Sequence, residues 1–419
     1  MHVLFPVGTS DHCVISCNLK FVIPLCTTFE RTVWYYEKAN FNEYRQVLNE
    51  HDWGHCFAHD NIDDICNTWT NDFLNVSKMT VPNRQATIRP NDKPYYTNTH
   101  RRTKRKLDRA HKKAKQTNAP GDWATFRTQR NQYISDLRSA ETSYEKKVCD
   151  SLQASSNLSP KKWWHIAKSF LGIHPNYSLP PMEDENGKIY VNDKDKASAF
   201  NDFFMNQTKI NASGKFLPEF TDKCDGNSLS DITTTPEEVY DILKSLKTNK
   251  ATGPDGVSAK LLREAGASIA KPLSDIINLS LKTQQVPQAW KQAHVAPIHK
   301  NKERNKFINY RPISLLSCSG KVMERVVFKH VFNFFRDHNL LSKFQSGFTP
   351  GDSTVNQLVE IYHTFCDALD KKKDVRAVFC DISKAFDRVW HDGLILKLNQ
   401  IGIKGNLLGW FKIYLENRK

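Results

Sequence analysis

The stretch FCDISKAFDRVW, from Phe379 to Trp390, decides how this sequence is interpreted. The residues Ala377 to Cys380 form a short apolar run that predicts a buried strand, and Ser383 to Phe386 predict the first turn of a helix. Asp381 then stands at the end of the strand. A carboxylate in that position can hold a divalent metal ion beside a phosphate. The pattern makes Asp381 the first candidate catalytic residue.

Further motifs precede this stretch. NYRPISLLSCSGKVMERVV covers residues 309–327, and KFQSGFTPGDSTVNQL covers residues 343–358. Upstream of both, SLKTNKATGPDGVSAKLLREAG covers residues 245–266 and places glycine, proline and a single carboxylate, Asp255, in a turn before a helix. In this order, the motifs resemble the reverse transcriptase of a non-LTR (LINE-type) retrotransposon.

The resemblance implies a fold and a reaction. The expected fold class is α/β (α+β): the fingers and the start of the palm of a right-hand polymerase, preceded by a mainly helical basic region and a short β remnant of an endonuclease sandwich. The implied activity is that of an RNA-directed DNA polymerase that uses two-metal nucleotidyl transfer and Mg²⁺. The implied partners are an RNA template, a DNA primer or target, and deoxynucleoside triphosphates.

The same resemblance assigns roles to individual residues. Asp381 would bridge both metal ions, and the backbone carbonyl of Ile382 would be a further ligand. Phe386 matches the aromatic residue that excludes the ribose 2′-hydroxyl. Gln345 and Gly347 lie in a loop that the family places beside the template and nucleotide.

Two predicted strands upstream form a hairpin of the fingers. Residues 290–300 alternate as one strand, Asn309 begins its partner, and a polar tip at residues 301–306 separates them. In related polymerases two cations on this hairpin clamp the triphosphate, and Lys300 and Arg311 occupy the matching places. Fixed cations suit this task because charge builds on the phosphoryl oxygens during transfer. The alternative is a surface hairpin with basic residues of no special role.

A strongly basic segment precedes the polymerase motifs. Between residues 101 and 115, Asp108 is the single acid. With a second helix at residues 122–152, the segment predicts an antiparallel helical hairpin. The formal net charge of +15 favours a polyanionic partner, so we expect contact with the phosphates of RNA or DNA, the alternative being a solvated face. The candidate residues are Arg101, Arg102, Lys104, Arg105, Lys106, Arg109, Lys112, Lys113 and Lys115.

The N-terminal residues carry a shorter motif. Ser10, Asp11 and His12 resemble the closing motif of the apurinic-type endonuclease that precedes the polymerase in many LINE proteins. In that family the histidine contacts the scissile phosphate and the aspartate belongs to the same site. The alternative is an ordinary capped turn. Most of the residues that phosphodiester cleavage needs are absent, so the resemblance does not extend to activity.

Histidines and cysteines gather further along the chain. Their spacing fits no standard zinc finger, because a structural site needs paired ligands at both ends of a loop. Partly buried helix residues are the expected outcome, with zinc as the alternative. The residues are His51, His55, Cys56, His59 and Cys66.

Cysteine usage and hydropathy point to a compartment. The ten cysteines include no CxxC pair, and the N-terminus lacks the apolar stretch of a signal peptide. No apolar run approaches the length of a membrane span. We therefore expect free thiols, no membrane partner, and a cytoplasmic and nuclear location.

The predicted organisation has four parts: an endonuclease remnant at 1–28, a connecting region at 29–97, a basic helical region at 98–234, and fingers with the start of a palm at 235–419. No Tyr-Ala-Asp-Asp sequence follows Asp381. We therefore expect the polymerase segment to be truncated and this chain to be inactive alone. The alternative function is a catalytically inactive nucleic-acid-binding remnant.

Overall fold

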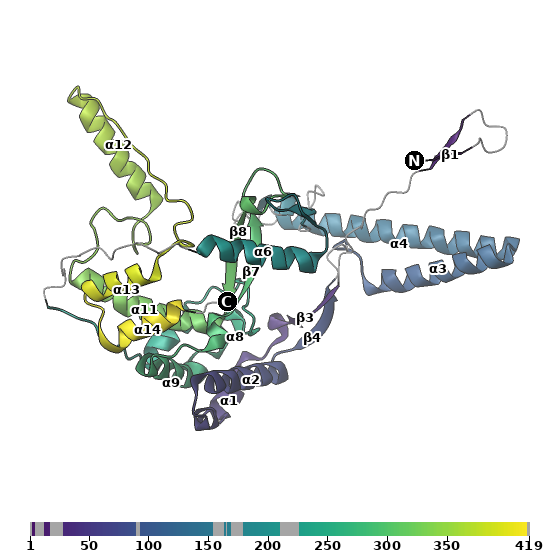
Figure 1. Ribbon diagram of the computed structural model, residues 1–419. Coiled ribbons are helices and arrows are strands. Elements are labelled where there is room, and N and C mark those ends of the chain that lie inside the picture. The colour runs from purple at the N-terminus through teal and green to yellow at the C-terminus, as the bar shows by residue number, and fades with distance from the viewer. Residues whose placement is uncertain are drawn as a thin grey trace. The chain divides into compact units, whose positions relative to one another are not determined.

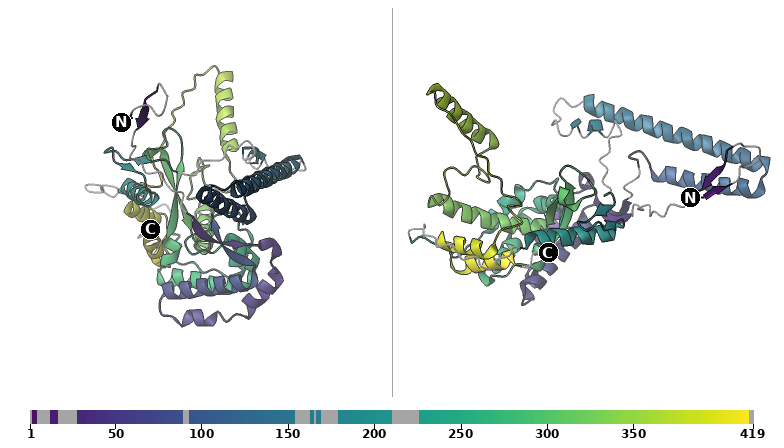
Figure 2. Two further views of the ribbon diagram at one scale, coloured as in Figure 1. Left: turned by 90° about the vertical axis from the view of Figure 1, so that its right-hand side faces the viewer. Right: turned by 45° about the horizontal axis from the view of Figure 1, so that its top comes forward.

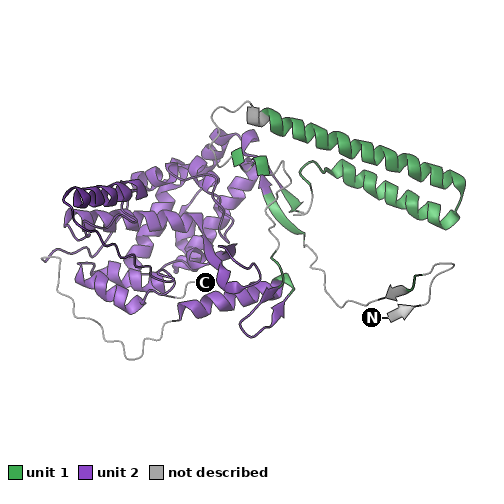
Figure 3. Cartoon of the chain, turned by 90° about the horizontal axis from the view of Figure 1, so that it is seen from above, with its two compact units in different colours: residues 1–32, 85–181, 191–193 green, residues 33–84, 182–190, 194–419 purple. Residues whose placement is uncertain are grey.

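The computed structural model describes residues 2–4, 12–16, 28–88, 93–153, 163–164, 166–168, 179–209 and 226–416 (Figure 1). The chain divides into two compact units (Figure 3). Unit 1 comprises residues 1–32, 85–181 and 191–193, and unit 2 comprises residues 33–84, 182–190 and 194–419. All the polymerase-like motifs therefore lie in unit 2.

Unit 1 contains the predicted helical hairpin. Helices α3 (Asn98–Thr117) and α4 (Pro120–Gln153) lie side by side in Figures 1 and 2. Asn118 ends α3 in a left-handed conformation, with φ of 50°, which lets the chain reverse. The two helices are joined by the stacked rings of His111 and Phe126, whose centroids are 4.6 Å apart, and by Leu107, which is buried. The prediction of an antiparallel hairpin is confirmed.

Every sheet in the described part of the chain has two strands. A hairpin turn at Gly187, with φ of 79°, joins two of them. The pairs are β1 (His2–Leu4) with β2 (Val14–Ser16), β3 (Phe29–Trp34) with β4 (Asn83–Ile88), β5 (Met182–Glu183) with β6 (Ile189–Tyr190), and β7 (Ala293–His299) with β8 (Tyr310–Leu316).

The core of unit 2 is helical and brings together segments far apart in sequence. Tyr44 and Trp69 share one buried cluster with Trp410. Hydrogen bonds join the same segments: the hydroxyls of Tyr36 and Ser258 lie 2.9 Å apart. Residues 33–84 are therefore packed into the same unit as the polymerase motifs. The core helices are α1 (Phe41–Glu50), α2 (Ile62–Thr80), α7 (Pro236–Lys244), α8 (Ala259–Ala265), α9 (Ala267–Thr283), α11 (Cys318–Asp337) and α14 (Gly405–Leu415).

Two helices of unit 2 begin at a capping side chain. Thr235 caps α7, and its hydroxyl oxygen accepts a hydrogen bond from the Glu238 amide at 3.3 Å. Ser353 caps α12 (Thr354–Asp370) in the same way, accepting from the Asn356 amide at 3.2 Å. The remaining helices are η1 (Tyr36–Lys38), η2 (Gly54–Ala58), α6 (Asp193–Thr208), α10 (Gln288–Lys291), η3 (Phe307–Asn309) and α13 (His391–Gln400).

The buried strand predicted at residues 377–380 is wrong. This segment is irregular, and Val378 and Phe379 are 88% and 86% exposed. A strand needs hydrogen-bonding partners along its edge, and in the described residues the sheets contain no strand from this segment. The apolar composition of residues 377–380 predicts burial, but it does not provide the neighbouring strand that a sheet requires.

The strand predicted to begin at Trp290 begins instead at Ala293. Residues 288–291 form the short helix α10, and Trp290 is buried in the core of unit 2. The tryptophan therefore anchors the base of the hairpin and does not belong to its alternating pattern.

The cysteines and the hydropathy of the helices were the subject of two sequence predictions. Seven described cysteines, from Cys13 to Cys380, are free thiols, as predicted. None of the described helices combines the length and apolar character needed to cross a bilayer.

Candidate nucleotide and nucleic-acid site

The β7–β8 hairpin places the two candidate triphosphate-binding cations on one face. Its antiparallel register pairs Ile298 with Arg311 and His299 with Tyr310, and the Lys300 amide donates to the Asn309 carbonyl at 2.9 Å. Directly paired residues of an antiparallel sheet point to the same side, and successive residues alternate. Lys300 and Arg311 are therefore diagonal neighbours, about 7–8 Å apart between Cα atoms. Both are exposed.

Neither cation is neutralised by another residue that the structure describes. No ion pair or hydrogen bond connects the side chain of Lys300 or Arg311 with another described residue. Two adjacent, unpaired positive groups on a rigid hairpin can bind the oxygens of a polyphosphate. Such a pair indicates polyphosphate binding more specifically than scattered basic residues do.

The opposite face of the hairpin is fixed by an aromatic cluster. Tyr310 is buried, and its ring lies 5.1 Å from that of Phe200 on α6 and 5.2 Å from that of His299. Phe200 also contacts Phe307, with ring centroids 4.7 Å apart. The sequence analysis missed this role, although the aromatic spacing of α6 was the available signal. α6 therefore holds the cationic face in position from behind.

The β5–β6 hairpin supports the tip in the same region. The Glu183 amide donates to the Asn305 carbonyl at 2.8 Å, and the Glu183 carboxylate lies 2.8 Å from the Lys306 ammonium. Lys306 is therefore neutralised within the fold, unlike Lys300 and Arg311. This contact distinguishes a structural cation of the hairpin from the candidate binding cations.

The turn at residues 250–256 packs against the end of β8. Gly256 has φ of 73°, which favours glycine. Gly253 is needed for another reason: a β-carbon there would come within 2.5 Å of the Ser317 amide nitrogen. Burial raises the pKa of the Asp255 carboxyl above its usual value, and its Oδ1 accepts a hydrogen bond from the Val257 amide at 3.3 Å. The turn is thus a rigid support for the hairpin.

The Gln345–Gly347 loop makes contact with the Phe386 region. The Gln345 amide donates to the Gly347 carbonyl at 2.7 Å, and both residues belong to the loop that precedes α12. Phe348 in this loop lies edge-on to Phe386, with ring centroids 5.7 Å apart. Asp352 accepts a hydrogen bond from the amide of Ser353, the N-cap of α12, at 2.7 Å.

Asp381 and Ile382 lie on the irregular segment between α12 and α13, and both are exposed. In the described residues, no hydrogen bond or ion pair joins Asp381 to Lys300 or Arg311. The described chain has one group of three closely spaced metal-ligating side chains, and Asp381 does not belong to it. One carboxylate and one carbonyl do not make a two-metal site. The donor set around Asp381 therefore does not by itself fit the implied Mg²⁺ pair.

The basic residues of α3 separate into two sets. Arg101 is half-buried, with its guanidinium 2.7 Å from Asn98 Oδ1, while Lys104 pairs with Asp108 at 2.6 Å and Lys113 with Asp122 at 2.8 Å. Lys115 is exposed. The other five are exposed, have no ion-pair partner among the described residues, and recur at three- or four-residue spacing along one helix face. This basic stripe comprises Arg102, Arg105, Lys106, Arg109 and Lys112.

The N-terminal endonuclease motif is only partly described. Asp11 lies outside the described residues, and His12 is exposed just before β2. The described part of this segment is the β1–β2 pair, in which Leu4 pairs with Val14. The endonuclease resemblance stays a prediction.

Comparison with known proteins locates the family match. Residues 298–419 match the family described as reverse transcriptase (RNA-dependent DNA polymerase). The chain is 37% identical over 184 residues to a Drosophila melanogaster protein named probable RNA-directed DNA polymerase from transposon BS, covering 44% of this chain and 20% of the relative. It is 28% identical over 300 residues to the corresponding protein from transposon X-element of the same species, covering 70% of this chain and 33% of the relative.

A third relative is the RNA-directed DNA polymerase from mobile element jockey of Drosophila melanogaster, 34% identical over 185 residues, which are 44% of this chain and 20% of the relative. The chain thus spans between 20% and 33% of the length of these relatives. The resemblance inferred from the motifs is confirmed for residues 298–419. These residues match the reverse transcriptase family, and the chain is similar to RNA-directed DNA polymerases of Drosophila mobile elements.

Proposed function

We propose that this chain is part of an RNA-directed DNA polymerase of a non-LTR retrotransposon, acting on an RNA template, a DNA primer and deoxynucleoside triphosphates. The observation that carries the proposal is the shared face of Lys300 and Arg311 within the segment that matches the reverse transcriptase family. These cations would bind the triphosphate and stabilise the charge that develops during transfer. The hairpin is held from behind, so little reorganisation is needed when nucleotide binds.

Metal ions would supply the charge that activates the primer hydroxyl and stabilises the leaving group. Asp381 and the Ile382 carbonyl are the proposed ligands from this segment. Because this donor set is insufficient alone, further carboxylates would have to complete it. Phe386, whose ring lies edge-on to that of Phe348, would exclude a ribose 2′-hydroxyl. Gln345 and Gly347 would lie beside the template.

Nucleic-acid binding without turnover is the second candidate function. The basic stripe of α3 favours it, because unpaired exposed cations along one helix face are suited to a phosphate backbone. From Arg102 to Lys112 the stripe extends about 15 Å along the helix axis. That length covers about four base-pair steps of a duplex. The two functions are compatible, since a polymerase must hold its template.

A chimera tests the polymerase proposal. The palm and thumb of the transposon BS relative are fused after Lys419, and primer extension on an RNA template is measured. Arg311→Ala should lower kcat/KM for nucleotide by about 10² or more, because it removes a preorganised charge from the transition state. Lys302→Ala, a change of another exposed lysine at the hairpin tip, is the matched control and should have little effect. An active chimera that tolerates Arg311→Ala would refute the triphosphate clamp.

The N-terminal motif supports only a limited proposal. Asp11 and His12 would derive from the endonuclease that precedes such polymerases. Nicking of supercoiled DNA that disappears on His12→Ala would show that the motif takes part in cleavage.

A further inference from the structure

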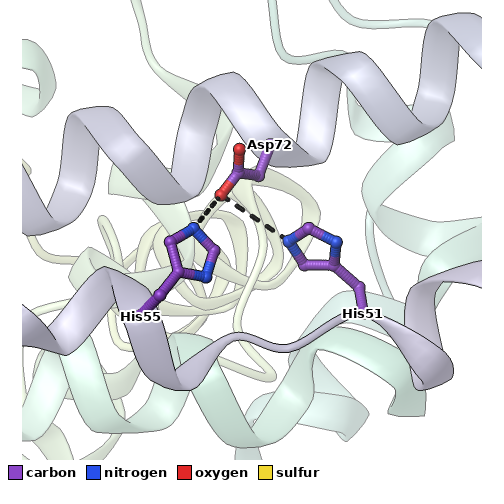
Figure 4. A group of neighbouring side chains, drawn as sticks. All are labelled: His51, His55 and Asp72. Atoms are coloured by element: carbon purple, nitrogen blue, oxygen red, sulfur yellow. Dashed lines mark hydrogen bonds and ion pairs between the residues drawn. The ribbon is translucent and has the colours of Figure 1, made fainter.

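A cluster of metal-binding side chain types lies in unit 2, on helices outside the polymerase motifs. His51 ends α1, His55 lies in η2, and Asp72 lies on α2. Their ligand atoms all lie within 4.8 Å of one another. Figure 4 shows both imidazole rings directed toward the Asp72 carboxylate. The sequence suggested two of these three residues but not Asp72, which the packing of α2 brings to the site.

The hydrogen bonds of His55 define which ring nitrogen faces the carboxylate. Nδ1 lies 2.5 Å from the Asp52 carbonyl oxygen, and a carbonyl can only accept, so Nδ1 carries the proton. In the neutral ring, Nε2 is then an acceptor, yet it lies 2.8 Å from Asp72 Oδ2, a second acceptor. A proton or a metal ion between Nε2 and Oδ2 removes the repulsion between these two acceptor atoms. A ligand histidine whose other nitrogen donates to a carbonyl is also the usual arrangement in metal sites.

His51 provides an independent observation. Its Nε2 is buried and has no hydrogen-bond partner among the described residues. The atom lies 3.6 Å from Asp72 Oδ2, which is too long for a hydrogen bond. Two ligands of one tetrahedral zinc ion are separated by about 3.3 Å when both bonds are close to 2.0 Å. The orphaned nitrogen is therefore close to the position of a second ligand.

Cys56 can complete a tetrahedral set. Its Sγ lies 3.8 Å from Asp72 Oδ2 and 3.9 Å from His55 Nε2. In a zinc site these separations are about 3.6 Å, because the zinc–sulfur bond is about 2.3 Å. The group whose ligand atoms all lie within 4.8 Å of one another is His51, His55 and Asp72, so a four-ligand site also needs Cys56 Sγ to come closer to His51, besides an opening of the His55–Asp72 distance by about 0.5 Å. Two imidazoles, a thiolate and a carboxylate favour zinc over magnesium or calcium.

We infer that His51, His55, Cys56 and Asp72 bind one structural Zn²⁺ ion, which fastens the end of α1 and the η2 segment to α2. Binding replaces the thiol proton of Cys56 with the metal ion and releases that proton to solvent. All four protein ligands are then occupied, so the site has no open position for substrate and is structural. Trp53 stacks edge-on against His51, with ring centroids 4.5 Å apart, and helps to enclose it. The inference is independent of the proposed polymerase function.

The full 419-residue chain, expressed with added zinc and dialysed, is tested first. We expect about one zinc ion per chain by elemental analysis. Replacement by Co²⁺ should give the intense visible bands of a tetrahedral site and a near-ultraviolet thiolate-to-cobalt band. Absence of zinc above background, or an octahedral Co²⁺ spectrum, would overturn the inference and leave a His55–Asp72 ion pair.

Variants then assign the ligands. Asp72→Asn and His51→Gln should each weaken Zn²⁺ binding by at least about 10²-fold, since even outer-sphere changes cost 10–100-fold. Cys56→Ser should abolish the thiolate-to-cobalt band. His59→Gln is the matched control, because His59 lies in the same stretch but contacts Thr68 at 3.1 Å; it should bind like the unmodified chain. Equal weakening by His59→Gln, or a thiolate band that survives Cys56→Ser, would reject the assigned ligand set.

Discussion

Gly253 and Ser317 approach each other so closely that a β-carbon on residue 253 would lie 2.5 Å from the Ser317 amide nitrogen. The neighbouring atoms are also backbone: the Leu316 carbonyl carbon and oxygen are 2.6 and 2.8 Å from the same position. Backbone atoms cannot rotate away as a flexible side chain can. The turn at residues 250–256 is therefore locked against the junction between β8, the strand that carries Arg311, and α11.

Gly253→Ala should destabilise unit 2 by about 1–3 kcal/mol, because the added methyl group overpacks a backbone contact. Chemical denaturation of the 419-residue chain, monitored by tryptophan fluorescence, measures the change. Gly121→Ala is the control: no atom lies within 4 Å of its β-carbon position. In this helical position alanine should be neutral or stabilising. Equal unfolding midpoints for both variants would show that the Gly253 contact relaxes without cost.

Neutralising the basic stripe should reduce the salt dependence of nucleic-acid binding. The variant carries Arg102→Gln, Arg105→Gln, Arg109→Gln and Lys112→Gln. The slope of log K against log salt should fall in magnitude by about 0.7 to 0.9 for each phosphate that the stripe no longer neutralises, because fewer counterions are released. Fluorescence anisotropy with labelled RNA and DNA at several salt concentrations gives the slope.

A control variant removes the same amount of positive charge from α4, the second helix of the hairpin. Arg127, Arg130, Arg138 and Lys146 are exposed on α4, and their replacement by glutamine changes the net charge equally. The slope should change less than in the α3 variant. If both variants flatten the slope equally, the stripe is a solvated face and net charge alone determines binding.

The Glu238 carboxylate should make stability depend on pH. Burial acts to raise its pKa, but Lys329, His330 and Thr234, with contacts of 2.8, 3.0 and 2.8 Å, together hold the pKa below its usual value of 4.5. A lowered pKa means stability that is present above 4.5 and lost as pH falls through the folded-state value.

Glu238→Gln should therefore destabilise unit 2 by about 1–3 kcal/mol at neutral pH, and by progressively less as pH falls below 4.5. Urea denaturation at several pH values measures the difference. Asp241→Asn serves as a control, because Asp241 is an exposed carboxylate on the same helix. A difference between Glu238→Gln and the unmodified chain that stays constant with pH would contradict the proposed linkage.

Phe386→Ala should relax discrimination against ribonucleotides in the active chimera, because a smaller side chain leaves space for the 2′-hydroxyl. Extension with deoxynucleotides should remain within a few-fold of the parent. The ratio of kcat/KM for the two nucleotide types is the measurement. Phe348→Ala tests whether the edge-on contact positions the gate, and should produce a smaller change of the same sign. An unchanged ratio in Phe386→Ala would exclude this residue as the gate.

The sequence alone determined the similarity to reverse transcriptases, the helix starts with capping residues, and the strands of the β7–β8 hairpin. These features are local: Thr235 and Ser353 cap helices through side-chain oxygens three residues from their donors, and alternation predicts a strand without reference to a partner. The helical hairpin of α3 and α4 was predictable for the same reason. The sequence showed that α3 is basic, but it did not show which of its cations are neutralised. The ion pairs with Asp108 and Asp122 depend on side-chain placement.

Only the tertiary structure decided which distant residues meet. Apolar character suggested a strand at residues 377–380, but a strand requires a neighbouring strand, and the described fold gives none to this segment. Asp72 joins His51 and His55 because α2 packs against α1, a contact that no spacing rule contains. The aromatic cluster behind Lys300 and Arg311 likewise depends on α6 reaching the hairpin from about a hundred residues away. Burial and partnership are properties of the folded chain, whereas capping and periodicity are already present in the sequence.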